Sequence, residues 1–156
     1  MKKILVVYYS RTQTTKKVAM QLAEKLGADV EEIKDTVDRK GAKGYLISGR
    51  DATLRKLTVL EKSEKNLRDY DLVIIGTPIW SWNMSVPVRT YLTDHKSEFP
   101  EVTFFCTMGG SGDKRAFAEM GEIIEKKPIA TLTLKTVEVV KDLTGEKINE
   151  FVKSIN

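Results

Sequence analysis

Short apolar segments recur along this chain, and longer amphipathic segments separate them. The clear apolar runs are residues 3–9 (KILVVYY), 71–76 (DLVIIG), 102–107 (VTFFCT) and 129–134 (IATLTL). The first three are continuous rather than alternating, which is typical of parallel strands that are buried on both faces. A weaker candidate at residues 28–33 (ADVEEI) alternates more. We therefore expect five strands.

The connecting segments carry the apolar period of helices. In residues 14–26 apolar side chains recur four residues apart, and Gly27 follows as a helix-ending residue. Similar patterns cover residues 86–94, 113–126 and 143–155. Residues 41–68 have the weakest pattern, which predicts an irregular helix broken near Gly49 and then a polar connector.

Strands that alternate with helices predict a parallel sheet with helices on both faces. We expect a single α/β domain over residues 1–156, with a doubly wound five-stranded parallel sheet of order 2-1-3-4-5. In such sheets ligands bind beyond the carboxyl ends of the strands, where the strand order reverses. This reasoning selects three loops: residues 10–15, 77–85 and 108–113.

The first loop, SRTQTT, places four hydroxyl groups at a strand-to-helix turn: Ser10, Thr12, Thr14 and Thr15. The first backbone N–H groups of a helix have no partner within it, and with the helix dipole they attract anions. Hydroxyl groups beside them suit a phosphate. The alternative is helix capping, which needs only one such residue. The loop lacks the glycine pattern of nucleotide-triphosphate and dinucleotide sites.

The second loop, GTPIWSWNMSVPV (76–88), carries Trp80 and Trp82 directly after a buried strand. Two tryptophans at this position suggest a flat aromatic ligand, or else a surface for a protein partner. The third loop, TMGGSGD (107–113), has three glycines within four residues, which allows close approach of the backbone to a ligand. One ligand that suits all three loops has a phosphate at one end and a planar ring at the other, as flavin mononucleotide (FMN) does.

These motifs resemble those of the flavodoxin family. YYSRTQTT is similar to its phosphate loop, GTPIWSWNMSVPVRTYL to its first flavin-flanking loop and the helix that follows, and CTMGGSGD to its second flanking loop. The resemblance covers essentially the whole chain and implies a flavodoxin-like fold with non-covalent FMN. The short connection before the last helix resembles the short-chain branch of the family.

The resemblance also implies roles for individual residues. Ser10, Thr12, Thr14 and Thr15, with the backbone of Arg11 and Gln13, would hold the phosphate. Thr77, Pro78, Ile79 and Trp80, with Trp82 beside them, would line one side of the isoalloxazine. The segment Thr107, Met108, Gly109, Gly110, Gly112 and Asp113 would supply backbone groups to the pyrimidine edge of the ring.

Three features depart from the family pattern. Gln13 and Thr14 stand where the family commonly has Gly and Asn, and the second flanking loop lacks the aromatic residue that stacks on the flavin in typical carriers. The net charge is also +4, whereas typical carrier flavodoxins are strongly acidic. The glycines at 109 and 110 leave that face of the site open.

Three functions follow as alternatives. The first is an FMN-binding electron carrier that passes electrons to protein partners. Because the chain is basic, we expect these partners to be acidic. The second is an NAD(P)H-dependent FMN or quinone reductase, with Arg11, Arg50 or Arg89 attracting the nucleotide phosphate. The third, a receiver-like module of the same fold class, is disfavoured because the segments YYS and GTPIW lack the acidic residues that such modules need.

Other patterns restrict the location and partners of the protein. Lysines are mixed with glutamates, as in LEKSEKNLRD, which favours a solvated face over a nucleic-acid site. No apolar run reaches the ~18 residues of a membrane span. The single cysteine, Cys106, lies within an apolar strand and suits a reducing cytoplasm. We therefore expect a cytoplasmic protein that binds neither nucleic acid nor membranes, with an unreactive thiol.

Overall fold

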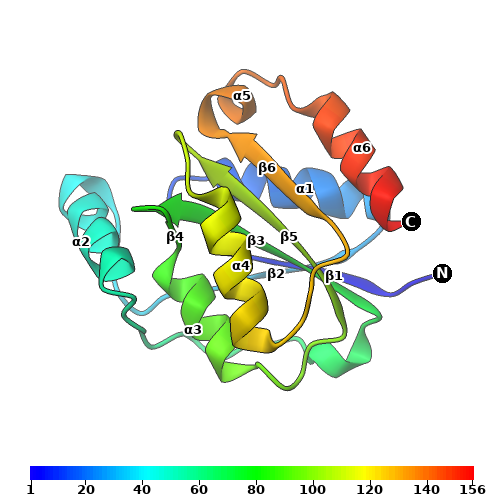
Figure 1. Cartoon of the computed structure of the whole chain (residues 1–156), viewed down its shortest axis with the longest axis horizontal. Helices are drawn as coiled ribbons and strands as arrows, with labels where there is room; N and C mark the ends of the chain where they lie inside the picture. The colour runs from blue at the N-terminus through cyan, green and yellow to red at the C-terminus, as the bar shows by residue number, and fades with distance from the viewer.

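The computed structural model describes residues 1–156 and contains one sheet with helices on both faces (Figure 1). The strands are β1 Ile4–Tyr8, β2 Asp29–Glu32, β3 Leu72–Trp80, β4 Asn83–Met84, β5 Glu101–Met108 and β6 Thr131–Lys135. Five of them are parallel in the order β2-β1-β3-β5-β6. This confirms the expected order 2-1-3-4-5 for the five long strands. The two-residue β4 pairs antiparallel with the end of β3 and was not predicted, because two residues carry no periodic pattern.

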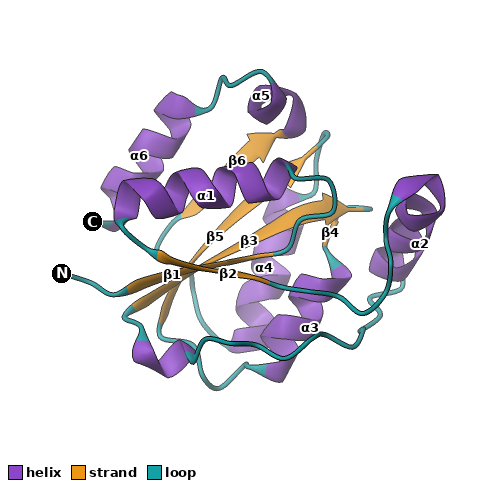
Figure 2. Ribbon diagram, turned by 180° about the vertical axis from the view of Figure 1, so that it is seen from behind, coloured by secondary structure: helices purple, strands orange, loops and turns teal.

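The helices are α1 Thr14–Leu26, α2 Gly41–Thr53, α3 Val86–Asp94, α4 Asp113–Ile124, α5 Thr136–Val140 and α6 Gly145–Ile155, with a 3₁₀ turn at Leu67–Asp69. α1, α5 and α6 cover one face of the sheet, and α3 and α4 cover the other (Figures 1 and 2). α2 lies at the periphery, beside the carboxyl ends of the strands. None of the helices has the length and apolar character of a membrane span.

α2 runs through Gly49 without interruption, so the expected break there is wrong. A glycine inside a helix costs only about 1 kcal/mol relative to alanine, which tertiary contacts can offset. Here the Gly49 carbonyl accepts a hydrogen bond from the Ser81 hydroxyl at 3.2 Å, which fastens α2 to the β3–β4 turn.

The sheet divides two apolar cores. Along β1, Leu5 and Val7 belong to the core beneath α3 and α4, whereas Val6 and Tyr8 belong to the core beneath α1 and α6. All four are 2% exposed or less. This two-sided burial explains why the strand is continuously apolar in sequence.

Candidate functional site

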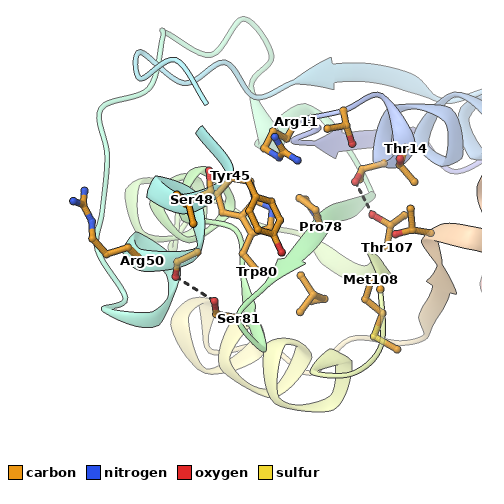
Figure 3. Close-up of a pocket in the computed structure, with 17 residues that line it drawn as sticks. Arg11, Thr14, Tyr45, Ser48, Arg50, Pro78, Trp80, Ser81, Thr107 and Met108 are labelled. Atoms are coloured by element: carbon orange, nitrogen blue, oxygen red, sulfur yellow. Dashed lines mark hydrogen bonds between the residues drawn. The ribbon is translucent and has the colours of Figure 1, made fainter. Parts of the chain in front are cut away.

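A cavity of about 620 Å³ opens at the carboxyl ends of the strands (Figure 3). Four segments form most of its wall: the loop after β1 with the start of α1, then α2, the end of β3, and the end of β5 with the residue that follows it. Ten of the seventeen residues expected at the site line this cavity, namely Arg11, Thr12, Thr14, Thr15, Pro78, Ile79, Trp80, Thr107, Met108 and Gly109. The three loops selected from the sequence thus meet at one place, as the position of the strand-order reversal predicts.

The N-terminus of α1 faces this cavity without a side-chain cap. The residue before the helix, Gln13, makes no capping hydrogen bond through its side chain and has a left-handed backbone with φ 73°. Capping therefore does not explain the hydroxyl-rich loop. The Ser10 hydroxyl is buried and has no hydrogen-bond partner, and such a group is costly unless something completes its bonding. Uncapped helical N–H groups beside an unpaired hydroxyl make this end of the site receptive to an anion.

One of the four hydroxyls joins two walls of the site instead. Thr15, in the first turn of α1, is 2% exposed, and its Oγ1 lies 2.8 Å from Oγ1 of Thr107, near the end of β5. Figure 3 shows this contact as a dashed line between the two segments. Thr12 and Thr14 remain more open toward the cavity.

The aromatic wall of the cavity is Trp80, at the end of β3. Its ring meets the ring of Tyr9 edge to face, at 88° and 5.5 Å between centroids. The Arg39 guanidinium lies over the indole, 5.5 Å from its centroid. Trp80 is half-buried, so it combines support from behind with a surface open to the cavity.

α2 supplies a wall that the sequence reasoning missed. Its contributions to the cavity are Tyr45, Leu46, Ser48, Gly49 and Arg50, and Ser81 and Thr136 complete the lining. The only signal in the sequence was the Tyr45–Leu46 pair within a weakly patterned helix. These two residues are largely exposed, 65% and 71% respectively, so they are not part of an apolar face that packs in the core and that a periodic pattern would reveal. The Arg11 guanidinium lies over the Tyr45 ring at 5.4 Å.

A buried ion-pair network holds α2 in this position. Arg39 is 3% exposed, and its guanidinium donates to Asp35 at 2.7 Å, to Asp51 at 3.3 Å and to the Ser48 hydroxyl at 3.4 Å. Backbone contact tightens the junction further, since a Cβ at Gly44 would lie 2.1 Å from the Arg39 carbonyl oxygen. Asp51 and Ser48 belong to α2, so Arg39 links this helix to the segment after β2.

The remaining seven expected residues lie near the cavity without lining it. These are Ser10, Gln13, Thr77, Trp82, Gly110, Gly112 and Asp113. Thr77 is fully buried and accepts a hydrogen bond from the Ser85 backbone at 2.9 Å, which orders the turn into α3. Asp113 accepts from the Thr133 hydroxyl at 2.9 Å, which joins the start of α4 to β6.

Trp82 points to solvent rather than into the cavity. It is 61% exposed, and its indole Nε1 donates to the Ser111 hydroxyl at 2.9 Å. Ser81 and Trp82 both have positive φ, 49° and 63°, so they form the tight turn between β3 and β4. Gly112, with φ 114°, is required opposite this turn because a Cβ there would lie 2.6 Å from Cα of Trp82. Because of this turn, Trp80 faces the cavity and Trp82 faces solvent.

The three arginines considered for a nucleotide phosphate also differ in position. Arg11 and Arg50 line the cavity, although Figure 3 shows the Arg50 side chain extending away from it. Arg89 does not line it, since its side chain is only 10% exposed and pairs with Glu119 at 2.7 Å. Of the three arginines, Arg89 therefore lies outside this cavity.

The cavity offers no reactive thiol. Cys106 is fully buried in β5, and burial raises its pKa to about 12 against a weaker opposing hydrogen bond with Thr133. The thiolate is the reactive form, so this side chain is inert at neutral pH, as the sequence predicts.

Comparisons with known proteins agree with this geometry. The family model described as flavodoxin matches residues 3–155. No protein with a curated function matches the sequence. A flavoprotein from Lactobacillus acidophilus, solved in complex with FMN, is 26% identical with a TM-score of 0.74, and the match covers 90% of this chain and 98% of that one.

Two more distant structures share the fold. A candidate flavoprotein from Bacteroides uniformis is 22% identical with a TM-score of 0.79, and the match covers 97% of this chain and 98% of that chain. An NADPH-quinone reductase from P. pentosaceus is 10% identical with a TM-score of 0.56, covering 100% and 98% of the two chains. Proteins described as flavoproteins and a protein described as a quinone reductase thus share this fold.

Proposed function

This chain belongs to the flavodoxin family, and on that premise we propose that it binds FMN non-covalently and acts in electron transfer. The observation that carries the proposal is the uncapped N-terminus of α1 beside the unpartnered Ser10 hydroxyl, at one end of a cavity whose wall holds Trp80. A phosphate and a planar ring at opposite ends of one ligand suit these two features.

The phosphate would be held by the loop after β1. Thr12 and Thr14 line the cavity there, and the backbone N–H groups of the first turn of α1 add to their hydroxyls. The Ser10 hydroxyl would gain the partner that it lacks. No further phosphate-binding glycine pattern occurs in the chain, which favours FMN over FAD.

The planar ring would lie against Trp80, with Pro78 and Ile79 beside it and the Thr107–Gly109 segment along its edge. When bound, FMN supplies the electron-transfer chemistry itself, and the protein supplies position and electrostatics. Arg11 at the cavity adds positive charge, which stabilises a negatively charged ring. We further propose cytoplasmic redox proteins with acidic surfaces as partners, because the net charge of the chain is +4.

A reductase that uses NAD(P)H is the second candidate, and one observation favours it. Gly109 lines the cavity, and a Cβ added there would meet no atom within 4 Å, so this side of the cavity is open to a second ring. The largely exposed side chains of Tyr45 and Leu46 line the same cavity.

Two measurements test these proposals. The first is the absorbance of the purified protein, followed by release of the flavin and its identification by chromatography, with FMN as the expected product. Release of FAD, or a protein that takes up no FMN at micromolar concentration, would refute FMN binding. The second is anaerobic mixing of the FMN-loaded protein with NADH or NADPH. Rapid bleaching of the flavin without a partner protein would favour the reductase, and its absence would favour the carrier.

A further inference from the structure

Three guanidinium groups surround the single carboxylate of Glu119, outside the cavity described above. Arg89 Nη2 donates to Oε2 at 2.7 Å, Arg55 Nη2 donates to Oε1 at 2.9 Å, and Arg115 Nε lies 3.5 Å from Oε1. Arg55 follows α2, Arg89 lies in α3, and Arg115 and Glu119 lie in α4. We call these four residues the Glu119 cluster. None of them lines the cavity.

The charges of the Glu119 cluster do not balance. Arg89 and Glu119, whose side chains are 10% and 18% exposed, already form a neutral pair. Arg55 and Arg115 add two further positive charges, and each side chain is 52% exposed. Exposed ion pairs contribute little to stability, and like charges gathered on one carboxylate repel each other. Fold stability therefore does not account for the second and third arginines.

The cluster also holds unused hydrogen-bond donors. Nε of Arg89 is buried and has no partner. On the planar guanidinium, Nε–H lies on the same edge as the Nη2 that donates to Glu119, so half of this donor fork is unfilled. Arg55 follows α2 in the left-handed conformation that is common after a helix, with φ 51°, and its backbone N–H donates to the Ala52 carbonyl at 3.0 Å. Its side chain reaches Glu119 from this position.

We propose that Arg55, Arg89 and Arg115 form a binding site for a dianionic phosphate group, with Glu119 holding the guanidinium groups together. Planar guanidinium forks match phosphate oxygens in geometry, and the excess of positive charge matches a dianion. Burial alone raises the pKa of Glu119, but the hydrogen bonds and charges of Arg89, Arg55 and Arg115 outweigh it and lower the pKa. The carboxylate accordingly stays ionised and keeps its hold on the arginines at neutral pH. The proposal does not depend on flavin binding.

The test is a titration with inorganic phosphate at constant ionic strength. Calorimetry measures the binding, and the Arg Nε–Hε resonances of ¹⁵N-labelled protein identify the residues involved. The protein is first saturated with FMN, so that the loop after β1 is not free to bind the added phosphate. If the protein binds no FMN, it is titrated without flavin, and the Nε resonances alone identify the site. We expect saturable binding that shifts the Nε resonances of Arg55, Arg89 and Arg115. Arg55→Gln and Arg115→Gln should each weaken binding at least about tenfold, the loss of a charge-assisted contact.

Arg68→Gln is the matched control, because Arg68 is exposed in the 3₁₀ turn before β3 and belongs to no ion pair. It should leave phosphate binding unchanged. A parallel titration with adenosine 5′-monophosphate distinguishes a free phosphate from one carried on an organic group. The proposal is overturned if no saturable binding occurs up to about 20 mM phosphate, a concentration that detects even millimolar affinity. It is overturned equally if Arg55→Gln and Arg115→Gln bind like the wild type, or if other Nε resonances shift instead.

Discussion

The guanidinium of Arg39 lies over the indole ring of Trp80, 5.5 Å from its centroid, and is itself 3% exposed. A buried cation thus supports the aromatic wall of the cavity from behind. The same guanidinium bonds Asp35 and Asp51, so the wall formed by Trp80 and the wall formed by α2 share one support.

Replacement of Arg39 should therefore destabilise the protein strongly. Arg39→Leu leaves the buried Asp35 carboxylate without its charge partner, and we expect a loss of about 3–5 kcal/mol in the free energy of unfolding, measured by urea denaturation. The control is Arg50→Leu. Arg50 also pairs with Asp51, but its side chain is 61% exposed, so its loss should cost only about 0–1 kcal/mol. Equal effects of the two variants would contradict the role of Arg39.

Trp80 and Trp82 should differ in their effect on flavin binding. Trp80→Leu removes an aromatic face from the cavity and should weaken FMN binding by about 1 kcal/mol, or roughly fivefold in Kd, beyond the loss of buried area. Trp82→Leu should leave the affinity and the flavin spectrum unchanged, because this side chain is 61% exposed outside the cavity. Fluorescence titrations with FMN measure both. The reverse order of effects would transfer the flavin contact to Trp82.

Thr12→Ala should weaken FMN binding more than Lys16→Ala. A hydroxyl that donates to a charged phosphate contributes roughly 1.5–3 kcal/mol, and Thr12 lines the cavity. Lys16 does not line it and would act only through a screened, longer-range attraction. Titrations at moderate salt concentration compare the two, and equal losses would argue against a phosphate held by hydroxyl groups.

Gln13→Gly should stabilise the protein. Gln13 has φ 73°, a left-handed conformation that is unfavourable for residues with a Cβ and open to glycine. After the entropic cost of glycine is subtracted, we expect a gain of about 0.5–1 kcal/mol in the free energy of unfolding. Glu24→Gly, at an exposed position within α1, is the control and should cost about 1 kcal/mol. A destabilising Gln13→Gly would show that the glutamine side chain stabilises the loop.

Stability should decline at alkaline pH. Burial raises the pKa of Cys106 from 9.0 to about 12, and that of Tyr9 from 10.0 to about 12. The folded state thus retains protons that the unfolded chain releases, so the stability is complete below about pH 9 and falls as the pH rises toward 12. Urea midpoints at about pH 8 and about pH 11 measure this decline. A midpoint that is unchanged would mean that these side chains ionise without unfolding.

The amino-acid sequence by itself determined the strand order, four of the helices and the place of the site. A parallel strand that is buried on both faces appears in the sequence as a continuous apolar run. The order of the strands then brings the loops after β1, β3 and β5 to one edge of the sheet. The hydroxyl cluster at residues 10–15 and Trp80 were recognisable for the same reason, because each follows a strand directly. No comparable local signal marked the α2 wall.

Only the tertiary structure decided which tryptophan faces the cavity and what closes its far side. Trp80 and Trp82 are separated by a turn with two positive φ values, and that turn fits because Gly112, thirty residues later in the chain, has no Cβ. α2 is fixed by the buried Arg39, whose partners Asp35 and Asp51 belong to different segments. In the sequence these residues are three ordinary charges, because burial and pairing arise only when distant segments come together.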